Sequence, residues 1–240
     1  GGVPFEATTT ELAPGDLLVL NETRVIAARL FGTRGHGSKA EVLLLRPSDR
    51  ARYDPASTHW LALVRPGRKL RVGAVVSFGE LGSATVTSVH DDDGVRELAF
   101  ELAVPFETLL ERAGKLPLPP YIHNDTRDAQ ERYQTVFART PGSVAAPTAS
   151  LHFTPELFER LAARGVETTR LELDVEQWTF RPLQTERIDE HLMHAESYSL
   201  PEATVAAIAR AKEEGRRVIA VGTTVARALD LNEDLTEAIG

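Results

Sequence analysis

Three histidines have neighbours that suit proton-transfer chemistry. His152 lies in a run of small residues, 143–154, that ends just before an expected helix. His191 and His194 are three residues apart, so on a helix both side chains would lie on one face. A histidine can accept or donate a proton near neutral pH. His152 is therefore a candidate catalytic residue.

Each histidine also has a simpler interpretation. His152 could be structural and hydrogen-bonded to the backbone of a tight loop. His191 and His194 could bind a metal ion or form a surface pair, but no third ligand at a suitable spacing is evident. The chain has no cysteine, which excludes disulfides, thiolate nucleophiles and cysteine-ligated metals. We therefore expect no metal site.

Two segments could bring substrate close to the backbone. One is the run 143–154, together with the Tyr-Gln-Thr sequence that ends at Thr135. The other joins an expected strand to an expected helix through Gly222, which is the usual ligand edge of an α/β sheet. Thr223 and Thr224 could instead serve only as helix caps.

Four positive charges gather within residues 65–71, at Arg65, Arg68, Lys69 and Arg71. Such a cluster could contact phosphate groups, or it could simply be the solvated tip of a hairpin. The formal net charge of −8 argues against broad nucleic-acid binding. A local basic patch could still serve, because only the docking face matters.

The elements expected around these residues fall into two groups. Residues 17–20 form a short apolar strand, and the next eighty residues have a β-like pattern broken by turns rich in Gly, Pro or Asp. Strands are expected at 25–31, 40–45, 60–64, 74–78, 84–89 and 95–102. Short strands at this spacing are typical of a small barrel or sandwich.

After residue 105, helices and strands alternate, which indicates an α/β domain. The pattern predicts helices at 106–113, 126–139, 201–214 and after 222, and one that starts at Thr154 and stops at Gly165. Strands are expected at 168–175 and 217–221. The β module is therefore inserted into, or precedes, an α/β domain.

With 42% hydrophobic residues, the chain can bury a sizeable core. No apolar run approaches the roughly 18 residues of a membrane span, so we expect no membrane association. The lack of cysteine suits a cytoplasmic protein.

Nine segments in one order resemble the S-adenosylmethionine:tRNA ribosyltransferase-isomerases of queuosine biosynthesis. Each segment alone is weak, but together they span nearly the whole chain. The resemblance implies an α/β domain, residues 1–23 and 105–240, with an inserted six-stranded antiparallel β-barrel at 24–104. The matching segments are residues 14–25, 28–32, 63–67, 117–122, 132–136, 143–154, 179–182, 191–194 and 218–224.

The resemblance also implies a reaction. The ribosyl part of S-adenosylmethionine is transferred to an aminomethyl-deazaguanine at the wobble position of tRNA and isomerised. The product is epoxyqueuosine, and adenine and methionine are released. S-adenosylmethionine is then a substrate, tRNA is the partner and no cofactor is needed. We expect a monomer.

The resemblance makes His152, His191 and His194 the candidates for proton transfer, without saying which is the base. The matching segments also suggest which residues bind substrate. Arginines are suited to bidentate contact with a phosphate or with the methionine carboxylate. The substrate-binding candidates are Asn21, Thr23, Arg24, Tyr133, Gln134, Thr135, Thr148, Phe153, Arg181, Thr223, Thr224 and Arg227. The cationic residues 65–71 would contact tRNA phosphates.

Two departures from the family pattern leave alternatives open. Residues 174–178 read Asp-Val-Glu-Gln-Trp where the family usually carries a histidine and Gly-x-Gly, and Ser150 replaces a usual glycine. One alternative is a divergent relative that binds RNA or S-adenosylmethionine, or acts on another acceptor, without this activity. Another is a barrel-containing enzyme that acts on a small molecule, which the net charge favours.

Overall fold

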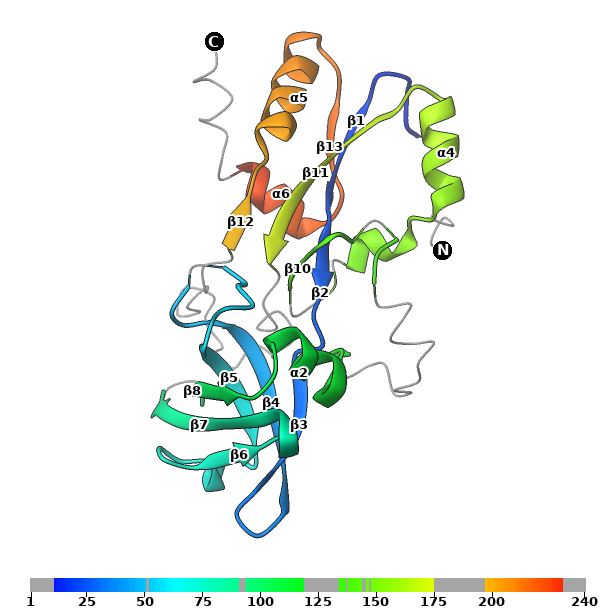
Figure 1. Ribbon diagram of the computed structural model, residues 1–240. Coiled ribbons are helices and arrows are strands. Elements are labelled where there is room, and N and C mark those ends of the chain that lie inside the picture. The colour runs from blue at the N-terminus through cyan, green and yellow to red at the C-terminus, as the bar shows by residue number, and fades with distance from the viewer. Residues whose placement is uncertain are drawn as a thin grey trace, which may run out of the picture.

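A computed structural model of the chain describes residues 11–50, 52–90, 94–118, 134–136, 138–143, 146, 148–174 and 197–230. These residues form an antiparallel β-barrel and a mainly parallel sheet with helices on both faces (Figure 1). The expected fold class, an α/β domain with an inserted small β-barrel, is confirmed.

Six antiparallel strands close the barrel. They pair in the order β3-β4-β5-β8-β7-β6, and β6 pairs back to β3. Closure leaves these strands without a free edge that another chain could pair with. The strands are β3 (Arg29–Arg34), β4 (Ser38–Pro47), β5 (His59–Arg65), β6 (Val75–Ser77), β7 (Gly82–Val89) and β8 (Arg96–Leu102).

Apolar side chains at alternate strand positions fill the barrel interior, which explains why the short strands alternate in sequence. Helix α2 (Phe106–Ala113) packs against this core. The Phe106 ring stacks on Trp60 with ring centroids 4.9 Å apart. Strand β9 (Gly114–Lys115) then pairs with β3. Two short 3-10 helices, η1 (Gly67–Lys69) and η2 (Gly79–Leu81), lie in the barrel connections.

The α/β part is built on a four-stranded sheet in the order β12-β11-β1-β13. Strand β1 (Leu17–Asn21) is buried along its whole length, as expected for a short apolar run in a parallel sheet. Strands β11 (Glu167–Asp174) and β13 (Val218–Ala220) lie parallel to β1, and β12 (Ser197–Ser199) is antiparallel to β11. The barrel is an insertion because its strands fall between β1 and β11 in the chain.

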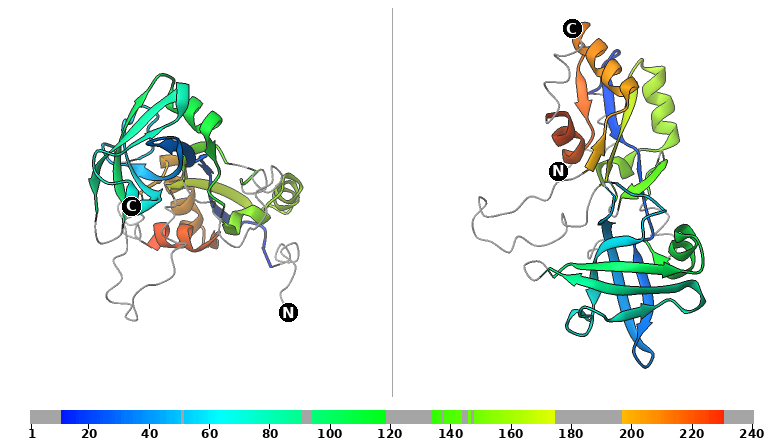
Figure 2. Two further views of the ribbon diagram at one scale, coloured as in Figure 1. Left: turned by 90° about the horizontal axis from the view of Figure 1, so that it is seen from below. Right: turned by 60° about the vertical axis from the view of Figure 1, so that its left-hand side comes forward.

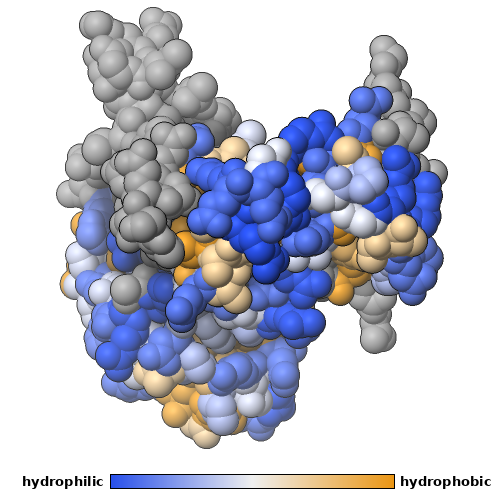
Figure 3. Space-filling view, turned by 90° about the horizontal axis from the view of Figure 1, so that it is seen from above, coloured by the Kyte–Doolittle hydropathy of each residue, from blue (hydrophilic) through white to orange (hydrophobic). Residues whose placement is uncertain are grey.

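Helices cover both faces of this sheet (Figure 2). Helix α4 packs over Leu18 of β1, and α5 and α6 pack on the opposite face beside Val19. Seen from above, the coloured surface is mostly hydrophilic, with smaller groups of hydrophobic residues between the hydrophilic ones (Figure 3). None of the helices in the described ranges is long and apolar enough to cross a membrane. Their bounds are α4 (Pro155–Ala163), α5 (Glu202–Glu213) and α6 (Thr223–Asp230).

Helix α4 begins and ends where the sequence predicts. The Thr154 hydroxyl accepts a hydrogen bond from the Leu157 N–H at 3.2 Å, and Pro155 occupies the first turn. Gly165 follows with φ of +76°, a conformation that favours glycine at a helix end.

One expected strand is split in two. Instead of a single strand at 25–31, β2 (Thr23–Val25) pairs with β10 (Thr140–Ser143), and β3 begins only at Arg29. The chain turns sharply between them, where the Ala28 N–H donates to the Ile26 carbonyl at 2.7 Å. This turn lets the chain pass from the sheet into the barrel.

The helix expected at 126–139 is wrong in its described part. Residues 126–133 lie outside the described residues, but 134–136 and 138–139 are not helical. Long-range hydrogen bonds replace helical ones. The Gln134 side chain bonds both the N–H and the carbonyl of Val25, and the Arg139 N–H donates to the Glu22 carbonyl at 2.9 Å.

The barrel and the sheet are joined at Glu172 of β11. Its Oε2 accepts from Arg52 Nη2 at 2.9 Å, and Arg52 lies in the connection between β4 and β5. Its Oε1 accepts from the Thr140 hydroxyl at 2.8 Å. The carboxyl ends of β1 and β11 point towards the barrel (Figure 1).

Candidate functional site

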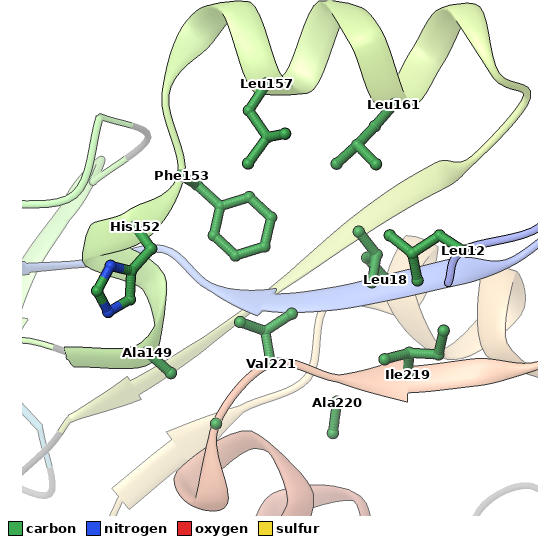
Figure 4. Close-up of a pocket in the computed structure, with 11 residues that line it drawn as sticks. Leu12, Leu18, Ala149, His152, Phe153, Leu157, Leu161, Ile219, Ala220 and Val221 are labelled. Carbon is green, nitrogen blue, oxygen red and sulfur yellow. The ribbon is translucent and has the colours of Figure 1, made fainter. Parts of the chain in front are cut away.

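A pocket lies along one face of the sheet, between α4 and strands β1 and β13 (Figure 4). Its volume is about 360 Å³, which is within the usual range for small-molecule sites. The walls are almost entirely apolar, with His152 as the exception. The lining residues are Leu12, Leu18, Ala149, His152, Phe153, Leu157, Leu161, Ile219, Ala220, Val221 and Gly222.

The pocket forms because η3 (Thr148–His152) turns directly into α4. The Phe153 ring is buried and stacks on Phe158 with centroids 5.3 Å apart, which holds η3 against the helix. Ala149 lies against Gly222, where an added Cβ would come within 3.1 Å of the Ala149 Cβ. Gly222 also has φ of +96°, so both space and backbone conformation favour glycine there.

His152 is exposed and lies at the end of the pocket formed by η3 (Figure 4). His152 is thus the one ionisable side chain among the residues that line the pocket. His152 and Gly222 were predicted separately from the sequence, as a candidate base and as part of the ligand edge of the sheet. Both line this one pocket, together with Phe153. His191 and His194, the other catalytic candidates, lie outside the described residues.

Two buried hydroxyl groups, neither of which lines the pocket, have unused hydrogen-bonding capacity. Ser150 in η3 is fully buried and Thr135 is 6% exposed. Within the described part of the chain, neither Oγ atom has a hydrogen-bond partner. A buried polar atom without a partner carries a free-energy cost.

Asn21 and Thr23 hold strands together. Asn21 Nδ2 donates to the Leu173 carbonyl at 2.9 Å, and the Leu173 N–H donates to Thr23 Oγ1 at 2.9 Å. The Thr23 hydroxyl also donates to Asn21 Oδ1 at 2.7 Å. Both side chains are buried, and these bonds fix the carboxyl ends of β1 and β11. Both residues were nominated as substrate contacts.

The other nominated residues are spread around this edge of the sheet. Arg24 is exposed on β2, and Gln134 is committed to the backbone of Val25. Thr223, Thr224 and Arg227 lie on the first turns of α6, directly after Gly222, and Thr148 begins η3. Tyr133 and Arg181 lie outside the described residues.

The cationic cluster at 65–71 lies far from the pocket. In the antiparallel barrel, Arg65 pairs with Glu41 at one end of β5, while Trp60 pairs with Pro47 at the other. The second end leads into the connection whose Arg52 contacts the sheet. The cluster is therefore at the opposite end of the barrel. All four of its charged side chains, Arg65, Arg68, Lys69 and Arg71, are exposed.

Sequence reasoning missed the apolar walls of the pocket. Leu18, Leu157 and Ile219 read only as core residues of a strand, a helix and a strand. Their spacing carries no sign that a cavity remains between them. The glycine at 222 was the available signal, because it marks a close approach of backbone after a strand.

A family model described as queuosine biosynthesis protein matches residues 3–239. A protein of Gloeobacter violaceus named S-adenosylmethionine:tRNA ribosyltransferase-isomerase is 52% identical, over 91% of this chain and 60% of its own length. A protein of Pelobacter propionicus with the same name is 46% identical, over 96% of this chain and 66% of its own. The chain thus spans somewhat less than two thirds of these relatives.

The S-adenosylmethionine tRNA ribosyltransferase of Thermotoga maritima, known from a crystal structure, has 30% sequence identity to this chain. The similarity covers 94% of this chain and 57% of that one, with a TM-score of 0.34. The family match extends over almost every residue. The chain therefore belongs to the queuosine biosynthesis protein family.

Proposed function

We propose that this protein transfers the ribosyl part of S-adenosylmethionine to an aminomethyl-deazaguanine in the wobble position of tRNA and isomerises it to the epoxy-cyclopentane of epoxyqueuosine. Adenine and methionine leave. Family membership over residues 3–239 supports the reaction class. The observation that carries the proposal is the pocket with His152 at its end, beside Gly222 where β13 leads into α6. In this proposal S-adenosylmethionine is a substrate, and the reaction takes place in the cytoplasm.

The apolar pocket suits the adenosyl end of S-adenosylmethionine. A flat base can lie between aliphatic side chains such as Leu18 and Val221, and its edge then needs only a few polar contacts. Arg24, exposed on β2, is a candidate for the methionine carboxylate.

His152 is the proposed proton-transfer group. The positive sulfonium acidifies the adjacent ribose carbon, so a base at that carbon starts the reaction. Adenine leaves more readily when a proton is delivered to it. A histidine can do either task near neutral pH, and His191 and His194 remain candidates for the other.

The position of the cationic cluster supports a macromolecular second substrate. Strand β5 has seven residues and so is roughly 20 Å long. A ligand that reaches from the sheet edge to Lys69 must therefore extend along the barrel, as an RNA stem can and a metabolite cannot. Exposed Arg and Lys at its far end suit phosphate contacts.

The departure at residues 174–178 favours a second candidate, a relative that binds S-adenosylmethionine or RNA without turnover. To separate the two, the full chain is incubated with labelled S-adenosylmethionine and tRNA that carries the aminomethyl-deazaguanine. We expect release of adenine that depends on this tRNA. Binding of S-adenosylmethionine without adenine release would favour the second candidate instead. Failure of the tRNA to bind even at low salt would favour a small-molecule enzyme.

A further inference from the structure

Arg96 is the first residue of β8, and its guanidinium reaches across to the connection that carries the cationic cluster. Its Nε donates to the Leu70 carbonyl at 3.1 Å, and its Nη2 donates to the Gly67 carbonyl at 3.2 Å. Its Nη1 donates to the Gly94 carbonyl at 2.6 Å. One side chain thus ties this connection to the β7–β8 hairpin.

The same connection is fixed from inside by Leu70, which is fully buried in the barrel core. The Leu70 N–H donates to the Gly67 carbonyl at 3.2 Å, so that oxygen accepts from both Leu70 and Arg96. With these two carbonyls turned towards Arg96 and Leu70 turned into the core, the charged side chains of Arg68 and Lys69 lie on the outside.

We propose that Arg96 is a positioning residue for tRNA binding. It holds residues 65–71 in the shape that presents their four charges to RNA phosphates together. This inference rests on the proposed function, in which the cluster contacts tRNA. Arg96 itself contacts only carbonyl oxygens in the described bonds, and so acts through Arg68 and Lys69.

A fixed conformation of residues 65–71 should strengthen RNA binding for two reasons. Phosphate binding strengthens with the number of cations that engage at once, because each releases counterions from the RNA. A loose connection would lose conformational entropy on binding RNA, whereas a fixed one has lost it already. Arginine suits the task, because its planar fork donates in several directions at once. A lysine has one compact ammonium group.

The test compares Arg96→Gln, Arg96→Lys and Lys69→Gln, with tRNA affinity measured by fluorescence anisotropy at two salt concentrations. We expect Arg96→Gln to weaken tRNA binding about tenfold, the equivalent of 1.4 kcal/mol. The KM for S-adenosylmethionine and the kcat at saturating tRNA should not change. Arg96→Lys should recover part of the loss. Arg112→Gln, which removes an exposed cation paired with Glu80 on the same barrel, is the control and should have little effect.

A double-mutant cycle separates positioning from general stability. If Arg96 positions Lys69, then Lys69→Gln should cost less affinity when Arg96 is already glutamine. Independent, additive losses would overturn the inference. The inference is also overturned if Arg96→Gln leaves the tRNA affinity unchanged while Lys69→Gln weakens it. In that case the proposed function still stands, because the cluster does contact tRNA. If Lys69→Gln and Arg68→Gln both leave tRNA affinity unchanged, the cluster does not contact tRNA and the proposed contact itself fails.

Discussion

His152 can be changed without disturbing the core, because its ring is exposed while its neighbour Phe153 carries the packing. We predict that His152→Ala lowers turnover by about 100-fold or more, the usual contribution of a general acid or base. The melting temperature should fall by less than about 2 °C, as for other surface substitutions. Adenine release and thermal unfolding measure the two effects. His36→Ala, in the exposed β3–β4 turn, is the control. If His152→Ala lowers the melting temperature markedly as well as the turnover, the role of His152 is structural.

Asp16 links the starts of β1 and β13 through Arg217. Its carboxylate accepts from Arg217 Nε at 2.8 Å and from the Ala13 N–H at 2.7 Å. The Arg217 hydrogen bonds, partly opposed by burial, hold the pKa of Asp16 below its ordinary value. The ionised form is therefore favoured in the folded state. Its contribution to stability is complete above the ordinary pKa and is lost as the pH falls through the lowered one.

We therefore predict that Asp16→Asn lowers the free energy of unfolding at pH 7 by about 1 kcal/mol, a small value because water screens the exposed Arg217. The deficit relative to the unmodified chain should shrink below about pH 4. Urea unfolding at several pH values measures it. Glu80→Gln, which breaks the exposed pair with Arg112, should change stability far less. A deficit that stays constant down to pH 3 would contradict the proposed ion-pair effect.

At the residue scale, the sequence indicates which segments lie together better than it indicates the contacts of each side chain. The run 143–154 and Gly222 do meet at one pocket. Asn21 and Gln134 were nominated as ligand contacts, yet their polar atoms bond strand backbones 152 and 109 residues away in the chain. A side-chain amide that hydrogen-bonds to backbone groups and one that binds a substrate look the same in the sequence. Only the fold distinguishes them.

Among the elements, the joint between α2, β9 and β3 is the most tightly fitted. Gly114 has φ of −98°, which any residue can adopt. A Cβ there would lie 2.3 Å from the Ala27 carbonyl oxygen and 2.4 Å from that of Leu110. We predict that Gly114→Ala destabilises the protein by about 2 kcal/mol through this steric clash. Gly67→Ala, whose Cβ would find only Arg96 at 3.7 Å, should cost much less. Because Gly→Ala also lowers the entropy of the unfolded chain, backbone entropy cannot cause a loss at either position. Similar losses in chemical denaturation would therefore contradict the steric clash as the cause.

Helices and strands were predicted correctly where the local sequence pattern favours the same element that the packing of the core requires. The strands of the barrel and the helix Phe106–Ala113 follow from alternation and periodicity, because the same apolar residues build the core. The prediction failed around Gln134, where the amphipathic pattern favours a helix. There the bonds from Gln134 to Val25 and from Arg139 to Glu22 tie the segment to β2 and to the end of β1. Such long-range bonds leave no mark in local sequence.

At the scale of the whole molecule, the barrel lies between the pocket and the far end that carries the cationic cluster, two sites that one RNA would reach in the proposed function. Its strands lie within residues 29–102, and those of the parallel sheet lie outside that interval. We propose residues 1–23 with 105–240 as one domain and 24–104 as the other. The pocket belongs to the first domain and the cationic cluster to the second. Their separation should therefore depend on how firmly the domains are joined.

Glu172 is the residue through which that joint can be tested. It holds Arg52 of the barrel connection and Thr140 of β10 together, and its side chain is 23% exposed. We predict that Arg52→Ala and Glu172→Ala couple by about 0.5–1 kcal/mol in a double-mutant cycle of unfolding free energies. Each should also raise the KM for tRNA more than that for S-adenosylmethionine, because in the proposed function only tRNA spans both domains. Arg50→Ala, which removes the exposed Arg50–Asp54 pair inside the same connection, is the control. Equal changes in both KM values would show that Glu172 acts on the pocket and not on the placement of the barrel.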